Sequence, residues 1–313
     1  MKDKIIEFIF KLLNCSNSNY YTYWIRPKNT DDIRYGEESF SDERIGIVLQ
    51  GQVIVKDHFT LKTIELYHRL YYKSPIILST WANENKEEIN KIRTIGNVYV
   101  IENEYPSISG HGHINYQRKS SINGIKKAKE LRCEYVLKSR TDQRMCGKNA
   151  IKYLVNLIEN YPLTIECKAK KRIAVCSLST LKNRLYNICD MLLFGDIDDV
   201  LLYFNPPEAP SFNDKLPDEE NYIDYAKARP GEIYFATHYI ENCGFDLKWT
   251  FEDSDYYRNN LFIVFNSEAV DQFWPKYNFK EYKWKSYTNY PHEIVSFEEW
   301  FMNQKLVNSS EEV

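Results

Sequence analysis

Short apolar runs alternate with helical segments through the first half of the chain, and no other feature of the sequence limits the fold as strongly. Helical periodicity is found over residues 60–72, 83–95 and 115–132. The apolar runs before, between and after these segments are 44–49, 76–81, 98–101 and 135–137. This order is typical of βαβ units, in which successive strands lie parallel and helices cover the sheet. We therefore expect an α/β fold with a mixed, mainly parallel, Rossmann-type sheet flanked by helices.

The second half of the chain is less regular. It contains an apolar segment at 186–195 and a proline-rich stretch at 205–217, with a further strand predicted at 173–176. Helices are expected at 149–160 and 233–242, and near the C-terminus. With no internal repeat and no long linker, we predict a helix and polar arm over 1–44, a catalytic domain over 45–265, and an extension over 266–313 packed on it.

Six charged or hydroxyl-bearing residues follow the apolar run 135–137, at the end of what should be a central strand. Ligands of open α/β sheets bind outside the carboxyl ends of strands, so charge there suggests a charged ligand. We expect cations to bind a diphosphate leaving group and Asp142 to bind a divalent ion whose other ligands are phosphate oxygens and water. The alternative is a solvated cluster of salt bridges. The six residues are Lys138, Ser139, Arg140, Thr141, Asp142 and Arg144.

Three other stretches are expected to line the same ligand. One is the loop after the first strand, where Gly51 allows a close backbone approach. Another is the end of the second strand. The third is the beginning of helix 115–132, where unpaired backbone N–H groups point outwards. The residues expected to bind a nucleotide sugar are Gln50, Gly51, Gln52, Thr80, Trp81, Asn115, Gln117, Arg118 and Ser121.

Two carboxylates are candidates for the acid–base chemistry of a transferase. Asp190 stands alone in the apolar segment 186–195, where burial would raise its pKa. Glu232 lies in the first turn of helix 233–242. An inverting transferase needs a base that takes the proton of the acceptor hydroxyl. We expect Glu232 to be that base and Asp190 to contact the acceptor; for each, a helix cap or a structural carboxylate is the alternative.

Composition excludes several classes of protein. The formal net charge of −3 gives no general attraction to nucleic acid, and 43% hydrophobic residues exclude wholesale disorder. The seven cysteines are odd in number and form no C-x-x-C, so neither a disulfide framework nor a zinc ribbon is indicated. The plain interpretation is a cytoplasmic protein with reduced thiols.

The N-terminal segment allows two interpretations. Its apolar residues share one helical face and lysines lie nearby, an arrangement that suits peripheral contact with an anionic inner-membrane surface. The alternative is packing on the protein's own domain. No apolar run reaches the roughly 20 residues of a transmembrane helix. The apolar residues are Ile5, Ile6, Ile9, Leu12 and Leu13.

Four blocks of sequence resemble the WavE family of bacterial surface-polysaccharide proteins. They are I-V-L-Q-G-Q at 47–52, N-Y-Q-R-K-S-S-I-N-G at 115–124, Y-V-L-K-S-R-T-D at 135–142 and D-M-L-L-F-G at 190–195. That family is similar to glycosyltransferases of the GT-A type and acts in lipopolysaccharide core or capsule synthesis, and the resemblance covers about residues 45–245.

The resemblance implies a GT-A-like glycosyltransferase that moves a sugar from a nucleotide-diphosphate donor to an oligosaccharide or lipid-linked glycan acceptor. Residues 50–52 and 80–81 would face the base and ribose. The S-R-T-D stretch would take the place of the metal-binding D-x-D motif, with Mn²⁺ or Mg²⁺ on Asp142. Arg140 replaces the first aspartate of that motif, which is a departure from the family pattern.

Two other functions are weighed against this one. A nucleotidyltransferase on a similar sheet would need a glycine-rich phosphate loop after the first strand, and no G-x-G-x-x-G occurs near residues 50–60. A non-catalytic polysaccharide-assembly protein would keep the fold and lack nucleotide affinity.

Overall fold

The computed structural model separates the chain into two compact units, residues 1–34 and 35–313. It describes residues 2–16, 26–33, 40–211, 216–275 and 293–309. The division predicted between residues 265 and 266 stays a prediction.

The first unit contains the helix α1 (Lys2–Ser16) and the short 3-10 helix η1 (Thr30–Asp32). Four large apolar side chains of α1 are 48% to 61% exposed: Ile5, Phe8, Ile9 and Leu12. Their spacing of three and four residues places them on one face of the helix. Across the described ranges, no helix has the length and hydropathy needed to cross a membrane.

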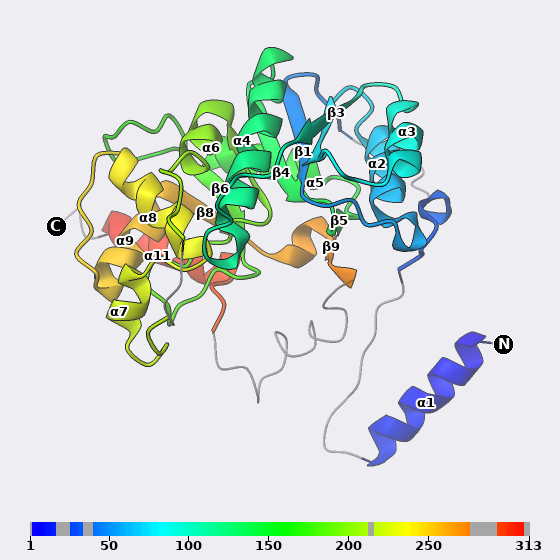
Figure 1. Cartoon of the computed structure of the whole chain (residues 1–313). Coiled ribbons are helices and arrows are strands. Elements are labelled where there is room, and N and C mark those ends of the chain that lie inside the picture. Colours follow the sequence, from blue (N-terminus) through cyan, green and yellow to red (C-terminus); the bar gives the residue numbers. More distant parts are fainter. Residues whose placement is uncertain (1, 17–25, 34–39, 212–215, 276–292, 310–313) are drawn as a thin grey trace. The chain divides into compact units, whose positions relative to one another are not determined.

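The second unit is built on a seven-stranded sheet with the order β3-β2-β1-β4-β7-β6-β8 (Figure 1). Neighbouring strands are parallel except at β7, which runs antiparallel to both β4 and β6. The expected mixed, mainly parallel α/β sheet is therefore confirmed. The strands are β1 (Ile45–Gln50), β2 (Ile76–Trp81), β3 (Val98–Asn103), β4 (Tyr135–Arg140), β6 (Ile173–Cys176), β7 (Leu193–Asp196) and β8 (Phe262–Phe265).

Helices cover the sheet, and two of its inner strands, β1 and β2, are therefore buried along their whole length. Every residue of β1 and β2 is buried, the pattern of strands covered on both faces. The helices are α2 (Phe59–Leu70), α3 (Lys86–Arg93), α4 (Ile114–Glu130), α5 (Ala150–Asn160), α6 (Ile197–Tyr203), α7 (Tyr222–Lys227), α8 (Glu232–Asn242), α9 (Phe251–Leu261) and α11 (Phe297–Ser309). Short 3-10 turns are η2 (Lys56–His58), η3 (His111–His113) and η4 (Ser267–Val270).

Helix α4 lies unusually close to the sheet because Gly124 has no side chain. A Cβ atom there would lie 2.5 Å from Cγ1 of Val48 and 3.2 Å from Cβ of Ser79. The helix therefore packs directly on β1 and β2. This close packing places the first turns of α4 beside the carboxyl end of β1.

A small second sheet brings the C-terminal part of the chain to the end of β4. Strand β5 (Arg144–Met145) follows β4 after a short turn and pairs antiparallel with β9 (Gln272–Phe273). The two strands lie next to each other below the main sheet in Figure 1. This pairing sets the position of Trp274, the residue that follows β9.

Candidate active site

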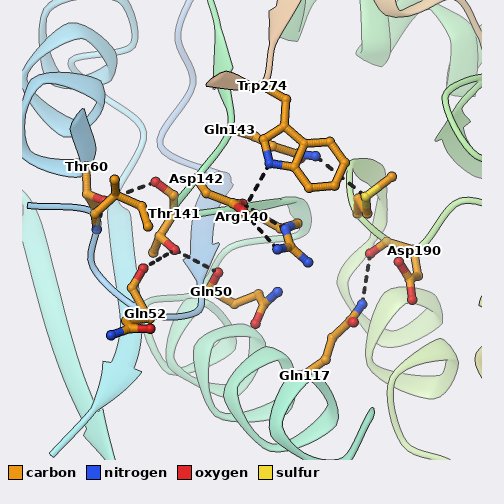
Figure 2. Close-up of polar contacts among 12 residues, drawn as sticks. Gln50, Gln52, Thr60, Gln117, Arg140, Thr141, Asp142, Gln143, Asp190 and Trp274 are labelled. Carbon is orange, nitrogen blue, oxygen red and sulfur yellow. Dashed lines mark hydrogen bonds and ion pairs between the residues drawn. The ribbon is translucent and has the colours of Figure 1, made fainter. Parts of the chain in front are cut away.

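Polar side chains from several separate segments meet at the carboxyl ends of β1 and β4 (Figure 2). They come from the end of β1 and the loop after it, from α2, from α4, from the end of β4 and the turn after it, from the segment before β7 and from the residue after β9. The residues labelled in the close-up are Gln50, Gln52, Thr60, Gln117, Arg140, Thr141, Asp142, Gln143, Asp190 and Trp274.

The most completely hydrogen-bonded group of this site is the carboxylate of Asp142. Arg140 donates to it through two nitrogens, from Nε to Oδ1 at 2.8 Å and from Nη2 to Oδ2 at 2.9 Å. Trp274 donates from its indole Nε1 to Oδ2 at 3.0 Å. Burial alone would raise the pKa of the Asp142 carboxyl, but the hydrogen bonds and charge of Arg140 outweigh it and hold that pKa below its ordinary value.

Lys138 is a buried cation beneath this pair. Its side chain is fully buried, and Nζ donates to the backbone carbonyl of Asp190 at 2.6 Å and lies 4.7 Å from the centre of the Phe204 ring. Burial lowers the pKa of the Lys138 ammonium to about 8, against the opposing charge of Asp190. In this structure Lys138 therefore holds the segment around Asp190 in place and does not face solvent.

The two predicted carboxylates, Asp190 and Glu232, lie close enough to influence each other. Asp190 is buried; burial, and then the charge of Glu232, raise the pKa of its carboxyl to about 7, while Lys138 and Arg140 oppose the rise. The amide of Gln117 donates to the backbone carbonyl of Asp190 at 3.4 Å. Glu232 begins α8 and is half-buried. The hydroxyl of Ser179 donates to Oε1 of Glu232 at 2.6 Å and orients it.

The loop after β1 is hydrogen-bonded to the turn after β4. Thr141 donates from Oγ1 to the carbonyl of Gln52 at 2.6 Å, and Gly51 has a φ of +118°. A Cβ atom on Gly51 would lie 3.1 Å from the Thr141 hydroxyl, so glycine allows this approach. Gln50 is buried, and its Oε1 accepts a hydrogen bond from Ser120 of α4 at 2.8 Å. Thr141 therefore holds the backbone after β1, and Ser120 of α4 holds the side chain of Gln50.

Two hydroxyls expected to bind the ligand, those of Ser139 and Ser121, are buried. Ser139 lies on β4 and Ser121 on α4. In the part of the chain that the structure describes, neither hydroxyl oxygen has a hydrogen-bond partner. A buried hydroxyl without a partner calls for an explanation such as an unseen water or ligand.

Five predicted site residues make other contacts. The side chain of Asn115 donates from Nδ2 to the carbonyl of Ala209 and accepts at Oδ1 from the N–H of Ala209, both at 2.8 Å. Arg118 donates from Nε to the carbonyl of Pro206 at 2.7 Å. Thr80 donates to Glu84 at 2.9 Å. Trp81 stacks on Tyr105 with ring centres 4.4 Å apart.

Arg144, the fifth of these residues, is buried against α2. It donates to Oγ1 of Thr63 at 3.0 Å and to the carbonyl of Phe59 at 3.1 Å, with its guanidinium 4.4 Å from the Phe59 ring centre. Arg144 therefore holds the beginning of β5 to α2. Arg140 lies beside Asp142, and Lys138 lies beside Asp190. Ligand contacts for all five residues stay predictions.

Sequence reasoning did not foresee the part that Trp274 plays at Asp142. Its place depends on the pairing of β5 with β9, between segments more than 120 residues apart, for which periodicity gives no signal. Ser179 was missed too. The contact of Ser120 with Gln50 could have been suspected from the sequence, because Ser120 precedes Ser121 in the block 115–124 that was expected to line the ligand.

The residues around Asp142 do not fit a divalent cation as they are arranged. Both of its oxygens accept hydrogen bonds, two of them from the guanidinium of Arg140. Among the residues that the structure describes, no group of three or more His, Cys, Asp or Glu side chains could hold a metal ion. We therefore derive no step through a metal on Asp142.

The sheet order, the single inverted strand and the polar cluster at the carboxyl ends of β1 and β4 define a GT-A-like, Rossmann-type α/β fold. The chain belongs to the WavE lipopolysaccharide synthesis family, whose sequence model matches residues 45–231. The matched region begins with β1, contains Asp142 and Asp190, and ends one residue before Glu232. No curated protein matches the chain. Family membership connects the protein with lipopolysaccharide synthesis.

Proposed function

We propose that the protein is a glycosyltransferase that moves a sugar from a nucleotide-diphosphate donor to a growing lipopolysaccharide or capsular glycan. Three findings support this proposal: the family, the GT-A-like sheet, and the position of the polar cluster at the carboxyl ends of its strands. The observation that carries it is that the Arg140–Asp142 pair lies at that end of the sheet together with the buried carboxyl of Asp190, on whose pKa the charges of Arg140 and Glu232 both act.

The donor would bind across the ends of β1, β2 and β4. We assign the base and ribose to residues 50–52 and to Thr80 and Trp81, and the diphosphate to Arg140 with the hydroxyls nearby. A diphosphate leaving group gathers negative charge as the glycosidic bond breaks, and a positioned guanidinium stabilises that charge.

The acceptor would bind on the side of Asp190 and Glu232. We assign Glu232 as the general base because it is the less buried of the two and because Ser179 orients one of its oxygens. Asp190 would contact the acceptor. Its raised pKa makes it a hydrogen-bond donor below about pH 7 and an acceptor above it.

A melting-temperature screen with UDP-, GDP- and CDP-linked sugars tests this proposal. A ligand bound by the native state alone raises the melting temperature, so one nucleotide class should raise it. The rise should shrink in Arg140→Ala and persist in Arg93→Ala, a matched arginine on α3 that pairs with Glu102 outside the site. A response to nucleoside triphosphates with release of pyrophosphate would favour a nucleotidyltransferase. No response to any nucleotide would favour a non-catalytic assembly protein.

A further inference from the structure

We propose that an arginine–carboxylate pair, and not a carboxylate-bound divalent cation, receives the diphosphate at the end of β4. The inference rests on the proposed function and concerns how the same site binds its donor. It starts from the three hydrogen bonds that converge on Asp142, two from Arg140 and one from Trp274.

Asp142 and Trp274 together fix the guanidinium of Arg140. The ion pair is bidentate, and the Arg140 guanidinium lies 5.2 Å from the centre of the Trp274 ring. Figure 2 shows this guanidinium between Trp274 on one side and Gln50 and Gln117 on the other. An arginine already held in one orientation loses little freedom when it binds phosphate, and its planar fork matches two phosphate oxygens.

The same contacts oppose a metal at this carboxylate. A cation on Asp142 would have to displace two charge-assisted hydrogen bonds from Arg140. It would also sit beside the positive charges of Arg140 and Lys138, both of which act on the same buried cluster. A D-x-D stretch carries two negative charges for a metal, whereas the Arg140–Asp142 stretch carries none in sum.

The solvent exposure of the side chains at this strand end favours Arg140 as the group that contacts the ligand. Its side chain is 27% exposed and that of Asp142 is 18% exposed. Lys138 is fully buried and Arg144 is buried against α2. Of the three cations expected at this strand end, Arg140 is therefore the one that solvent reaches, while Lys138 supplies charge from beneath.

The test is isothermal titration calorimetry of the full chain with UDP, GDP and CDP, once with EDTA and once with Mn²⁺. One nucleotide should bind in both conditions with Kd values within about threefold of each other. Arg140→Ala should weaken its binding roughly tenfold or more. Asp142→Asn should weaken it less, because Asp142 only orients Arg140. Arg93→Ala should bind as the wild type does.

The opposite results separate the two proposals. Binding that needs Mn²⁺ and disappears in Asp142→Asn would overturn the inference and leave the transferase standing. Absence of binding in both conditions would remove the proposed function and the inference together. The comparison of EDTA with Mn²⁺ uses the wild-type protein. It therefore tests whether nucleotide binding needs a metal even if a variant fails to fold. Mn²⁺ paramagnetic resonance without nucleotide gives a second readout, with no protein-bound signal expected.

A different observation supports a second proposal: we infer that the exposed apolar face of α1 lies on an anionic lipid surface. That face consists of Ile5, Phe8, Ile9 and Leu12. At about 100° per residue, Lys4 and Lys11 fall at its edge and Glu7 falls on the far side of the helix. Lysines at the edge of an apolar face can reach lipid phosphates while the apolar side chains enter the interface.

This arrangement of charge favours lipid over a second copy of the chain. Two copies packed through the same face would bring their edge lysines towards each other, whereas an anionic surface attracts them. The proposal is independent of the donor site and says nothing about catalysis.

Sedimentation of the full chain with phosphatidylglycerol-containing vesicles, and with pure phosphatidylcholine vesicles, tests it. The protein should sediment with the anionic vesicles, less with the neutral ones, and several-fold less in Phe8→Ser. Tyr256→Ser is the control, an aromatic on α9 that is 48% exposed against 61% for Phe8, and it should leave sedimentation unchanged. Equal sedimentation of wild type and Phe8→Ser would refute the proposal. A wild-type dimer that becomes monomeric in Phe8→Ser would do so as well, in favour of a second copy.

Discussion

Replacing Asp190 with asparagine should change how the stability of the protein depends on pH. Asp190 is buried, and the pKa of its carboxyl rises from 3.8 to about 7 on folding. Between these values the folded protein holds a proton that the unfolded chain releases. The contribution of Asp190 to stability is therefore fully present below the unfolded pKa and is lost as the pH rises through the folded pKa. Asparagine has a similar shape and no titrating proton.

The size of the effect follows from the shift. About three pK units correspond to about 4 kcal/mol in total, since one unit is worth about 1.4 kcal/mol. Of this, about 2 to 3 kcal/mol should be lost between about pH 4.5 and 6.5. That window lies below the pKa of about 8 of Lys138. Asp199, whose pKa burial raises to about 6, titrates in both proteins and cancels in their difference.

Urea unfolding of wild type and Asp190→Asn at several pH values in that window measures the difference directly. The free energy of unfolding of the wild type should fall relative to that of the variant by about 2 to 3 kcal/mol as the pH rises. A difference that stays constant across the window would show that Asp190 has an ordinary pKa, and the acid–base reasoning about this site would be refuted.

Three further predictions concern other parts of the molecule. Gly124→Ala should lower the free energy of unfolding, measured in urea, by about 1 to 2 kcal/mol, because the clash of the new Cβ with Val48 exceeds the gain in helix propensity. The control is Gly96→Ala, where the nearest atom to the new Cβ is 3.7 Å away. A Gly124→Ala protein more stable than the wild type would contradict the close packing of α4 on the sheet. Glu232→Gln should lower turnover roughly a hundredfold or more at an unchanged melting temperature, and full activity would remove Glu232 from the role of base. Arg144→Met should leave nucleotide affinity within about twofold, since this side chain contacts α2; a tenfold loss would return it to the binding site.

The first half of the fold could be predicted because two periods alternate in its sequence. The apolar runs of β1, β2, β3 and β4 and the helical segments between them differ clearly, and strands form at each of those runs. In the second half, the strand predicted at 173–176 and the helices predicted at 149–160 and 233–242 also form, but the segment 186–195 could not be interpreted in this way. Only the last three residues of that segment belong to a strand, Leu193–Asp196, and the antiparallel direction of this strand depends on the path of the chain.

The candidate site shows the same division between local and long-range information. The polar cluster after β4 was visible in sequence because it follows a buried strand. The turn after Arg140 reverses the chain, so Arg144 begins β5 and is buried against α2. Trp274 reaches Asp142 through a pairing of distant strands. Strand alternation could reveal neither position, because both depend on how the chain turns after the strand has ended.

The central claim is that the end of β4 holds the diphosphate of a nucleotide sugar. The most direct measurement is a crystal structure of the protein with the nucleoside diphosphate that raises its melting temperature. The diphosphate should lie within hydrogen-bond distance of the Arg140 guanidinium, between the carboxyl ends of β1 and β4 and the first turns of α4. A diphosphate bound anywhere else, with Arg140 and Asp142 still paired and apart from it, would contradict the account.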